Sequence, residues 1–182
     1  MIIEDTSIEG LKIINAKILN DNRGLFVKTF NDEIFKSHVI NVNIKETYYS
    51  VSHKDVIRGM HFQSPPHDHI KIVYVPAGRI LDVVLDLRNG SPTYGETYSV
   101  ELSAKNGKAI LIPSGLAHGF KSLEDNAITT YLQTSCYAPN HDCGIRYDSF
   151  NFDWNCETPI ISKRDMSFAT LNDFKTPFEY NA

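Results

Sequence analysis

The stretch IKIVYVPAGRILDVVLDL, residues 70–87, decides the fold class. Its first part is a run of β-branched and aromatic residues, and the turn residues PAG separate this run from RILDVVLDL. The second part alternates, with two sets of side chains on opposite faces: Leu81, Val83, Leu85 and Leu87 against Asp82, Val84 and Asp86. A period of two residues is typical of a β-strand. The stretch therefore predicts two strands joined by a short turn.

Strand signals of the same kind dominate the rest of the chain. Five more segments are rich in β-forming residues or alternate: LKIINAKIL (11–19), VNIKETYYSVS (42–52), ETYSVEL (96–102), KAILIP (108–113) and AITTYLQTS (127–135). Asn106-Gly107 lies between two of these segments and is a strong signal for a hairpin turn. Turn residues recur at intervals of roughly 8–12 residues, which is the spacing of a sandwich or barrel.

Helical signals are few. NDEIFKSHVI (31–40) has Asn31 or Asp32 as a candidate N-cap, and SFATLNDF (167–174) is a second candidate helix. No helices alternate with the strands, which excludes a parallel α/β architecture. A length of 182 residues suits one domain with a sizeable core. We expect one all-β domain over residues 1–182, a barrel or sandwich with short helices near its N- and C-terminal parts.

The composition is that of a soluble globular protein, with 42% hydrophobic and 22% charged residues. A net charge of −4 argues against nucleic-acid binding, which needs a basic surface. No segment approaches the ~20 apolar residues of a membrane span, and the N-terminal residues do not resemble a signal peptide. Cys136, Cys143 and Cys156 show no CxxC spacing. We expect a cytoplasmic protein with free thiols and no membrane or nucleic-acid partner.

Clustered histidines raise the alternative of a metal-dependent enzyme. His67 and His69 form an H-x-H motif, and His118 follows later in PSGLAHGF, as in a metal-binding jelly roll of the cupin type. The glutamate expected a few residues after such a motif is missing. Lys71 stands nearby instead, and its ammonium would repel a divalent cation. We therefore expect no metal, and keep a site built from these three histidines as the alternative.

His61 lies in a different setting, the motif RGMHFQ (58–63). A cation, Lys71, begins the following strand. Asp82 lies on the next strand, His118 lies just past a later one, and Tyr131 lies on the strand after that. A base, a cation, a second histidine and a phenol on adjacent strands can converge in the mouth of a barrel, where ligand pockets form.

Seven motifs together resemble one known family: DNRGLFVKTF, RGMHFQ, KIVYVPAGRILDVVLDLR, SPTYGE, LSAKN, IPSGLAHGF and TTYLQTSCYAP. Over roughly residues 13–165 the chain is similar to the dTDP-4-dehydrorhamnose 3,5-epimerase family. The resemblance implies a cupin-type jelly roll without a cofactor, and a homodimer that exchanges N-terminal strands. It also implies an isomerase that inverts C-3, C-5 or both of a nucleoside-diphosphate-linked 4-keto sugar, for surface polysaccharides.

The resemblance also assigns roles to individual residues. His61 corresponds to the general base, Asp165 to the carboxylate that orients it, Tyr131 to the acid on the opposite face of the sugar, and Lys71 to the group beside the ketone oxygen. The positions expected to bind substrate are Arg23, Phe26, Lys28, Glu46, Arg58, Gln63, Asp82, His118 and Tyr137.

These residue types suit the implied chemistry. Removing a proton next to a ketone moves charge onto the ketone oxygen, where a nearby ammonium such as Lys71 stabilises it. Histidine is a base poised near neutral pH, and a carboxylate partner fixes its tautomer. Inversion needs a proton donor on the other face, and a tyrosine phenol is protonated at neutral pH.

Three positions depart from the family pattern. Lys28 stands where the family usually has a glutamate, and Glu46 and Tyr48 stand where a glutamine and an asparagine usually precede the RGxH motif. The resemblance places this region at the thymine base, so the changes alter the hydrogen-bond donors and acceptors offered to it. A glutamate can accept paired hydrogens from guanine. A GDP-linked 4-keto hexose or heptose therefore stands beside a dTDP-linked sugar as the expected substrate.

Overall fold

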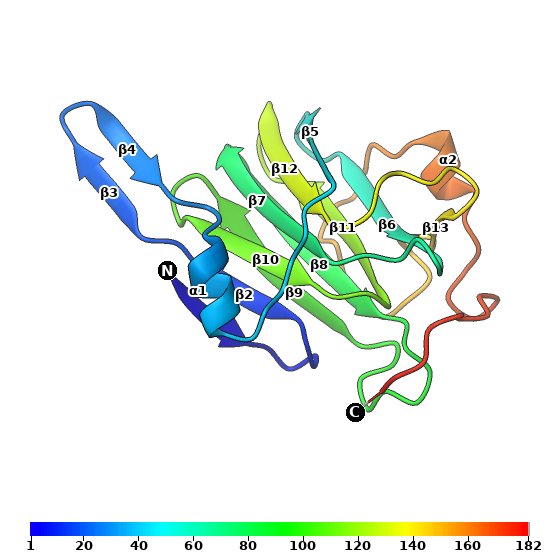
Figure 1. Ribbon diagram of the computed structural model, residues 1–182. Helices are drawn as coiled ribbons and strands as arrows, with labels where there is room; N and C mark the ends of the chain where they lie inside the picture. Colours follow the sequence, from blue (N-terminus) through cyan, green and yellow to red (C-terminus); the bar gives the residue numbers. More distant parts are fainter. Residues whose placement is uncertain (182) are drawn as a thin grey trace.

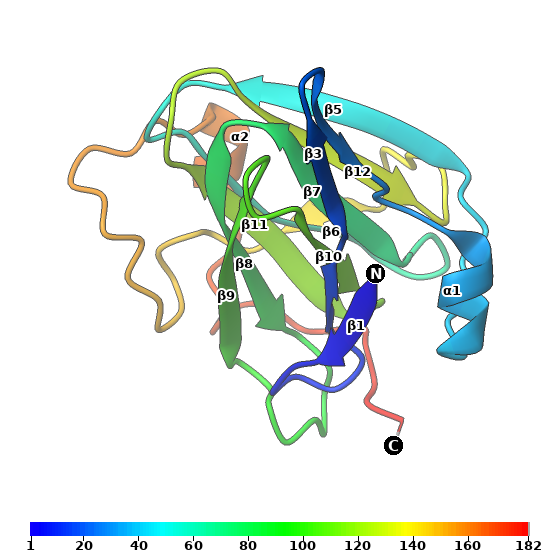
Figure 2. The same cartoon turned by 90° about the vertical axis from the view of Figure 1, so that its left-hand side faces the viewer.

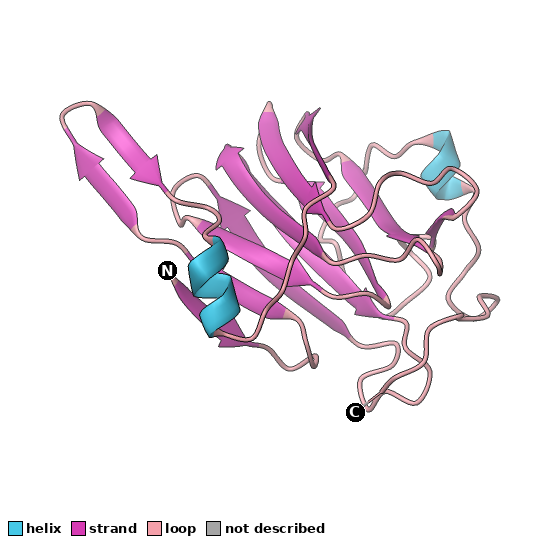
Figure 3. Cartoon of the chain, viewed as in Figure 1, coloured by secondary structure: helices cyan, strands magenta, loops and turns pink. Residues whose placement is uncertain are grey.

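The computed structural model describes residues 1–181, which form thirteen strands and two short helices (Figures 1 and 3). The elements in chain order are β1 (Ile2–Asp5), β2 (Lys12–Asn15), β3 (Ile18–Asp21), β4 (Gly24–Val27), α1 (Asp32–Ser37), β5 (Glu46–Ser52), β6 (Ile57–Gln63), β7 (Lys71–Ala77), β8 (Arg79–Asp86), β9 (Thr97–Ser103), β10 (Lys108–Ile112), β11 (Leu116–Ser122), β12 (Ala127–Gln133), β13 (Asp142–Gly144) and α2 (Lys163–Met166).

Two antiparallel sheets face each other as a jelly-roll sandwich. The six-stranded sheet has the order β1-β2-β10-β7-β12-β5, and the five-stranded sheet has the order β13-β6-β11-β8-β9. The hairpin β3–β4 forms a separate two-stranded sheet that extends away from the body (Figure 1). The predicted all-β class is confirmed.

Apolar side chains cover both faces of each sheet. Val73 and Phe120 belong to the central core between the sheets. Leu85 and Trp154 belong to a second cluster, formed by the five-stranded sheet and the C-terminal segments. Phe35 of α1 packs against the outer face of the six-stranded sheet in a third cluster. Because both faces are covered, polar side chains on central strands lie inside the protein, and each needs a partner there.

The turns at PAG and at Asn106-Gly107 connect the two sheets instead of closing hairpins. β7 and β10 belong to the six-stranded sheet, whereas β8 and β9 pair with each other in the five-stranded sheet. Asn106 still makes a tight turn, because its Oδ1 accepts the backbone N–H groups of Ser103 at 3.1 Å and Lys108 at 3.0 Å. The hairpin predicted at Asn106-Gly107 is therefore wrong. The turn residues reverse the direction of the chain, but the burial of each strand determines which strands it pairs with.

The predicted strand 11–19 is divided in two. β2 ends at Asn15, where Ala16 donates its backbone N–H to the carbonyl of Gly107 at 3.2 Å. The chain then leaves the sheet and enters β3; the hairpin extends away from the body in Figure 1, and Figure 2 views the molecule from that side. The predicted strand 42–52 is shorter than expected, since regular pairing begins only at Glu46.

One predicted helix is confirmed and the other is wrong. In α1, Asn31 is the N-cap and accepts the backbone N–H of Ile34 at 3.0 Å. Residues 167–174 form turns, because Leu171 and Phe174 pack into the cluster beneath the C-terminal segment. The second helix is α2, one turn earlier, with Ser162 as its N-cap. Among residues 1–181, no helix is long and apolar enough to cross a membrane.

We predict that Gly78→Ala destabilises the protein more than Gly90→Ala does. Both glycines have a positive φ, +73° and +78°, which costs other residues about 1–2 kcal/mol. A Cβ at Gly78 would lie 2.8 Å from the backbone of Ala127, whereas one at Gly90 meets nothing within 4 Å. Overpacking adds roughly 1–3 kcal/mol for Gly78→Ala alone. Urea unfolding of both variants measures the difference, and equal losses would contradict it.

Candidate active site

A cavity of about 350 Å³ opens between the two sheets. Its walls come from β5 and β12 of one sheet, β6 and β11 of the other, and residues of β13 and α2. The predicted site residues that line it are Glu46, Arg58, His61, Gln63, Lys71, His118, Tyr131 and Tyr137. Asp82 and Asp165 are buried and bond to the lining histidines. The sequence motifs therefore converge on one place in the fold.

His61 is held by a carboxylate from a distant part of the chain. Its Nε2 lies 3.0 Å from Oδ1 of Asp165, and Oδ2 of Asp165 accepts the backbone N–H of Gly59 at 3.3 Å. Burial alone would raise the pKa of Asp165, but these hydrogen bonds outweigh burial and hold that pKa below its usual value. An ionised Asp165 accepts the Nε2 proton of His61, which leaves Nδ1 as the nitrogen that can take a proton.

A second histidine–carboxylate pair lies beside the first. His118 in β11 is opposite His61 in β6, and its Nε2 is 2.7 Å from Oδ2 of Asp82. Burial lowers the pKa of His118 although Asp82 opposes the shift, so its ring is neutral at pH 7. Burial also lowers the pKa of Lys71 to about 8, again against the field of Asp82. Near neutral pH the cavity therefore presents one ammonium, from β7 of the six-stranded sheet, and a neutral imidazole, from β11 of the five-stranded sheet.

Tyr131 lies on the opposite wall from His61, because β12 and β6 belong to different sheets. Its ring stacks on Tyr48 with centroids 4.6 Å apart and an interplanar angle of 18°. Burial raises the pKa of Tyr131 well above its usual value, so the phenol keeps its proton. A flat ligand between the sheets would meet a base on one face and a proton donor on the other.

Two guanidinium groups line the same cavity. Arg58 in β6 donates to Oγ of Ser52 at 3.1 Å and to the carbonyl of Val51 at 3.3 Å. Arg164 in α2 forms an ion pair with Asp142 at 2.6 Å. Planar guanidinium forks suit phosphate oxygens, so these groups favour an anionic ligand.

Gln63 and Glu46 are bound to the loop that follows β12. The Gln63 amide donates to the Ser135 hydroxyl at 3.0 Å and to the Cys136 carbonyl at 3.2 Å, and its oxygen accepts the Ala138 N–H at 2.6 Å. Glu46 accepts the backbone N–H of Tyr137 at 2.6 Å. Both residues were predicted to bind substrate, and in the structure their polar atoms fix the loop that carries Tyr137.

Other residues that line the cavity were not predicted as site residues: Tyr48, Ser50, Phe62, His69, Phe120, Gln133, Asp142 and Arg164. Gln133 could have been found, because it shares a strand face with Tyr131. Asp142 and Arg164 follow no periodic pattern, and only the path of the C-terminal segments brings them to the cavity. His69 was considered as a ligand of the metal alternative; burial lowers its pKa to about 4, and its Nδ1 lies 3.0 Å from Oγ of Ser135.

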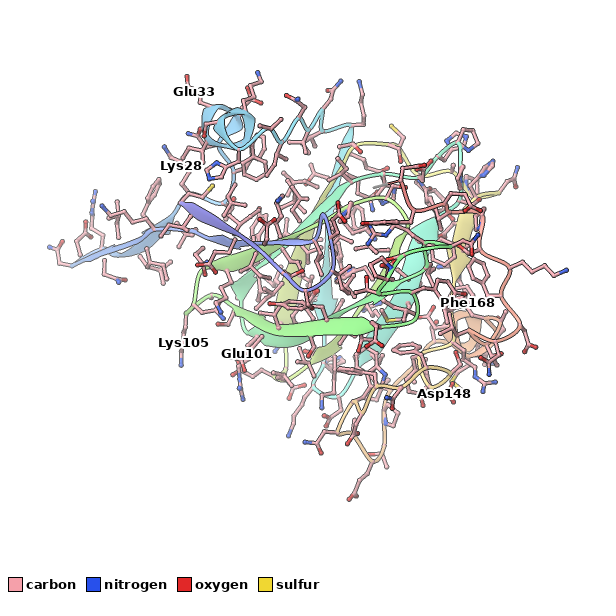
Figure 4. The ribbon with its side chains drawn as sticks, turned by 90° about the horizontal axis from the view of Figure 1, so that it is seen from below. Lys28, Glu33, Glu101, Lys105, Asp148 and Phe168 are labelled. Atoms are coloured by element: carbon pink, nitrogen blue, oxygen red, sulfur yellow. The ribbon has the colours of Figure 1, made fainter. Side chains whose placement is uncertain are left out.

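Four predicted substrate-binding residues do not line this cavity: Asp82 is fully buried against His118, whereas Arg23, Phe26 and Lys28 lie away from the cavity. Phe26 is in β4 and Arg23 in the turn before it, and both are exposed. Lys28 follows the hairpin, on the side of the molecule away from β13 and α2 (Figure 4). Within one chain, the hairpin contributes nothing to the cavity formed by the two sheets.

The histidines of the metal alternative do not come together. Within residues 1–181, no three His, Cys, Asp or Glu side chains are grouped so that they could hold a metal ion. His67 is exposed and its ring lies 4.6 Å from that of His141. Nε2 of His118 forms a hydrogen bond with Asp82, and Nδ1 of His69 forms one with Ser135. The expected ligand set of that alternative is therefore absent from the described residues.

Comparisons with known proteins give one family for this chain. The family model for dTDP-4-dehydrorhamnose 3,5-epimerase matches residues 5–173. The dTDP-4-dehydrorhamnose 3,5-epimerase of Methanothermobacter thermautotrophicus is 39% identical, over 92% of this chain and 93% of its own length.

Solved structures give the same result. The dTDP-6-deoxy-D-glucose-3,5-epimerase of Legionella pneumophila, in complex with dTDP-4-keto-L-rhamnose, matches with a TM-score of 0.94 at 35% identity, over 99% of this chain and 98% of that one. A 3'-monoepimerase of Streptomyces bikiniensis, in complex with dTDP-quinovose, has a TM-score of 0.86 at 31% identity, over 92% and 86% of the two chains. From the family model and these relatives together, we conclude that this chain belongs to the dTDP-4-dehydrorhamnose 3,5-epimerase family.

Proposed function

We propose that this protein inverts C-3 and C-5 of a dTDP-linked 4-keto sugar. One observation carries the proposal: the imidazole of His61 and the phenol of Tyr131 lie on opposite walls of one cavity that also holds the buried ammonium of Lys71. Inversion at carbon needs a base on one face and a proton donor on the other, and an adjacent ketone makes the proton removable.

Each group has one step in this reaction. Nδ1 of His61 takes the proton from the carbon next to the ketone, and Asp165 stabilises the imidazolium that forms. The electron pair of the broken C–H bond moves onto the ketone oxygen, where the ammonium of Lys71 stabilises the enolate. Collapse of the enolate takes the phenol proton of Tyr131 on the opposite face. The bulk solvent then takes the proton from the His61 imidazolium and returns a proton to the Tyr131 phenolate.

The nucleotide proposed is dTDP. Relatives of this chain have been solved with dTDP-4-keto-L-rhamnose and with dTDP-quinovose bound. Glu46 accepts the Tyr137 N–H with Oε2, and its remaining lone pairs are those available to a base. GDP remains the competing outcome, since Glu46 and Lys28 depart from the family pattern.

A homodimer is the second part of the proposal. Leu25 and Phe26 on the hairpin are exposed, and so are Tyr49 and Val51 on β5, which is an edge strand of the six-stranded sheet. An exposed apolar hairpin and an exposed apolar edge are each suited to pair with another chain. In a dimer, Arg23 and its neighbours would complete the partner's cavity instead of their own.

We predict that the protein exchanges hydrogen next to the ketone with heavy water, and that His61→Ala lowers this rate at least about 10²-fold, as loss of a general base does. Both a dTDP-linked and a GDP-linked 4-keto sugar are supplied, and NMR counts the deuterons at C-3 and C-5. We expect exchange at both carbons of the dTDP-linked sugar.

The matched control is His53→Ala. His53 also faces a carboxylate, Asp125 at 3.6 Å, but this pair lies on the surface. The His53→Ala variant should exchange substrate hydrogen at the wild-type rate. Exchange only with the GDP-linked sugar would overturn the choice of nucleotide, and wild-type exchange by His61→Ala would overturn the role of the base.

We predict that kcat/KM falls as the pH rises above about 8, because Lys71 loses its proton there. The ammonium is present below this pH and lost above it, so the enolate loses its counter-charge. The raised pKa of Tyr131 keeps the phenol protonated over the same range. Lys71→Arg should remove this decline in whatever activity it retains, since a guanidinium stays charged. Rates from pH 6 to 10 are the measurement, and an identical decline in Lys71→Arg would contradict the assignment.

We predict that Arg23→Ala and His61→Ala, each inactive alone, restore activity when co-expressed. If Arg23 serves the partner's cavity, one of the two sites in each mixed dimer is intact, which gives about a quarter of wild-type activity. If Arg23 acts within its own chain, no mixed dimer has an intact site. Activity of the co-purified mixture distinguishes the two, and sedimentation confirms that it is dimeric.

A further inference from the structure

Phe168 lies beside the proposed base, in a segment that no motif identified. Its ring centroid is 5.7 Å from that of His61, and the two ring planes are at 77°. The guanidinium of Arg164 lies 5.1 Å from the Phe168 centroid, and Asp142 pairs with that guanidinium at 2.6 Å. Figure 4 places Phe168 on the β13 and α2 side of the molecule. Neighbours on both sides therefore keep the phenyl ring against the imidazole.

Gly144 leaves the space that the phenyl ring occupies. Gly144 in β13 is directly opposite His61 in β6. A Cβ atom at Gly144 would lie 2.3 Å from Cε2 of Phe168, which is far inside van der Waals contact. The sheet thus has no side chain at the one position where the ring must lie to reach the imidazole.

The imidazole needs a further contact of this kind. Within the described residues, its hydrogen-bond partner is Asp165, and 29% of the His61 side chain is exposed. The torsion between Cβ and the ring is broad in histidine, so one hydrogen bond leaves the ring free to rock or turn over. Either movement takes Nε2 away from Asp165 and Nδ1 away from the substrate. Edge-to-face contact with a packed aromatic ring restricts this rotation.

We propose that Phe168 is a positioning residue for the base, an inference that rests on the function proposed above. Phe168 holds the imidazole with Nε2 toward Asp165 and Nδ1 toward the cavity, and it shields the pair from water on one side. Phe168 follows Asp165 by three residues, and its N–H is 3.5 Å from the Asp165 carbonyl. One short segment therefore supplies both the carboxylate that orients the base and the ring that limits its motion.

The test compares Phe168→Ala with Phe174→Ala. Phe174 makes a similar edge-to-face contact, with Phe62 of the same strand at 5.4 Å, but does not touch His61. In the deuterium-exchange assay, Phe168→Ala should lower kcat at least about tenfold, out of the roughly 10²–10⁴-fold that a general base supplies. KM should change less than about threefold, since Phe168 does not line the cavity. Phe174→Ala should leave kcat unchanged, and Phe168→Tyr, which keeps the ring, should restore it.

NMR of the ligand-free protein gives a readout that needs no substrate. In the wild type, the ¹⁵N signals of His61 should show a single tautomer with a proton on Nε2 that exchanges slowly with water. Phe168→Ala should show mixed tautomers or fast exchange, and Phe174→Ala should match the wild type. If the wild type shows no substrate exchange while the NMR difference holds, the proposed function fails and the positioning role stands.

Gly144→Ala keeps the proposal testable if Phe168→Ala is unstable. The added methyl should displace the ring, and so lower kcat as Phe168→Ala does. The double variant, in which the ring is gone, should be no slower than Phe168→Ala alone. An unchanged tautomer in a folded Phe168→Ala, or equal kcat losses for Phe168→Ala and Phe174→Ala, would overturn the proposal.

Discussion

The hydrogen bond between His61 and Asp165 is the contact on which the proposed function depends. It joins β6 to α2 across 104 residues of sequence at 3.0 Å. Neither partner is sufficient alone: without the carboxylate the imidazole has no fixed tautomer, and without the imidazole a buried carboxylate lacks its main hydrogen bond. Neighbouring residues hold the two side chains of this contact in place. Gly59 donates to the second oxygen, Ser162 begins the helix, and the clusters beneath the C-terminal segment hold that helix against the sheet.

The other charged groups of the site are stabilised less completely. Lys71 is buried near Asp82, and the free Asp82 oxygen has no hydrogen-bond partner within the described residues. Burying charges without full compensation reduces stability. The apolar clusters on both faces of each sheet offset this loss. What the cavity gains is an ammonium in a dry setting, where its attraction for a developing negative charge is stronger than in water.

The sequence predicted the strands well because alternation reports which side chains are buried. The resemblance also pointed to His61, Lys71, Tyr131 and Asp165, and their roles stay a prediction, but the structure does bring these four residues to one cavity. Strand pairing could not be predicted from turns, since Asn106-Gly107 reverses the chain whether or not the two strands pair with each other. The sequence did not predict Arg164, Asp142 and Phe168 as site residues, for a related reason. Their positions depend on where an irregular segment packs, and an irregular segment has no periodic pattern of apolar residues.

Turns that cross between the sheets have a consequence for how the molecule assembles. Because β7 and β8 separate into different layers, as do β9 and β10, most pairings join segments that are far apart in the chain, such as β5 with β12. Folds built from such distant pairings lose much chain entropy before their contacts form, and they fold slowly. The central core between the sheets is built from residues before 135, whereas Asp165 lies in a later segment whose neighbours pack into the second cluster. The central core and the carboxylate beside His61 therefore come from different segments of the chain, and a molecule whose C-terminal segment is undocked would keep the first and lack the second.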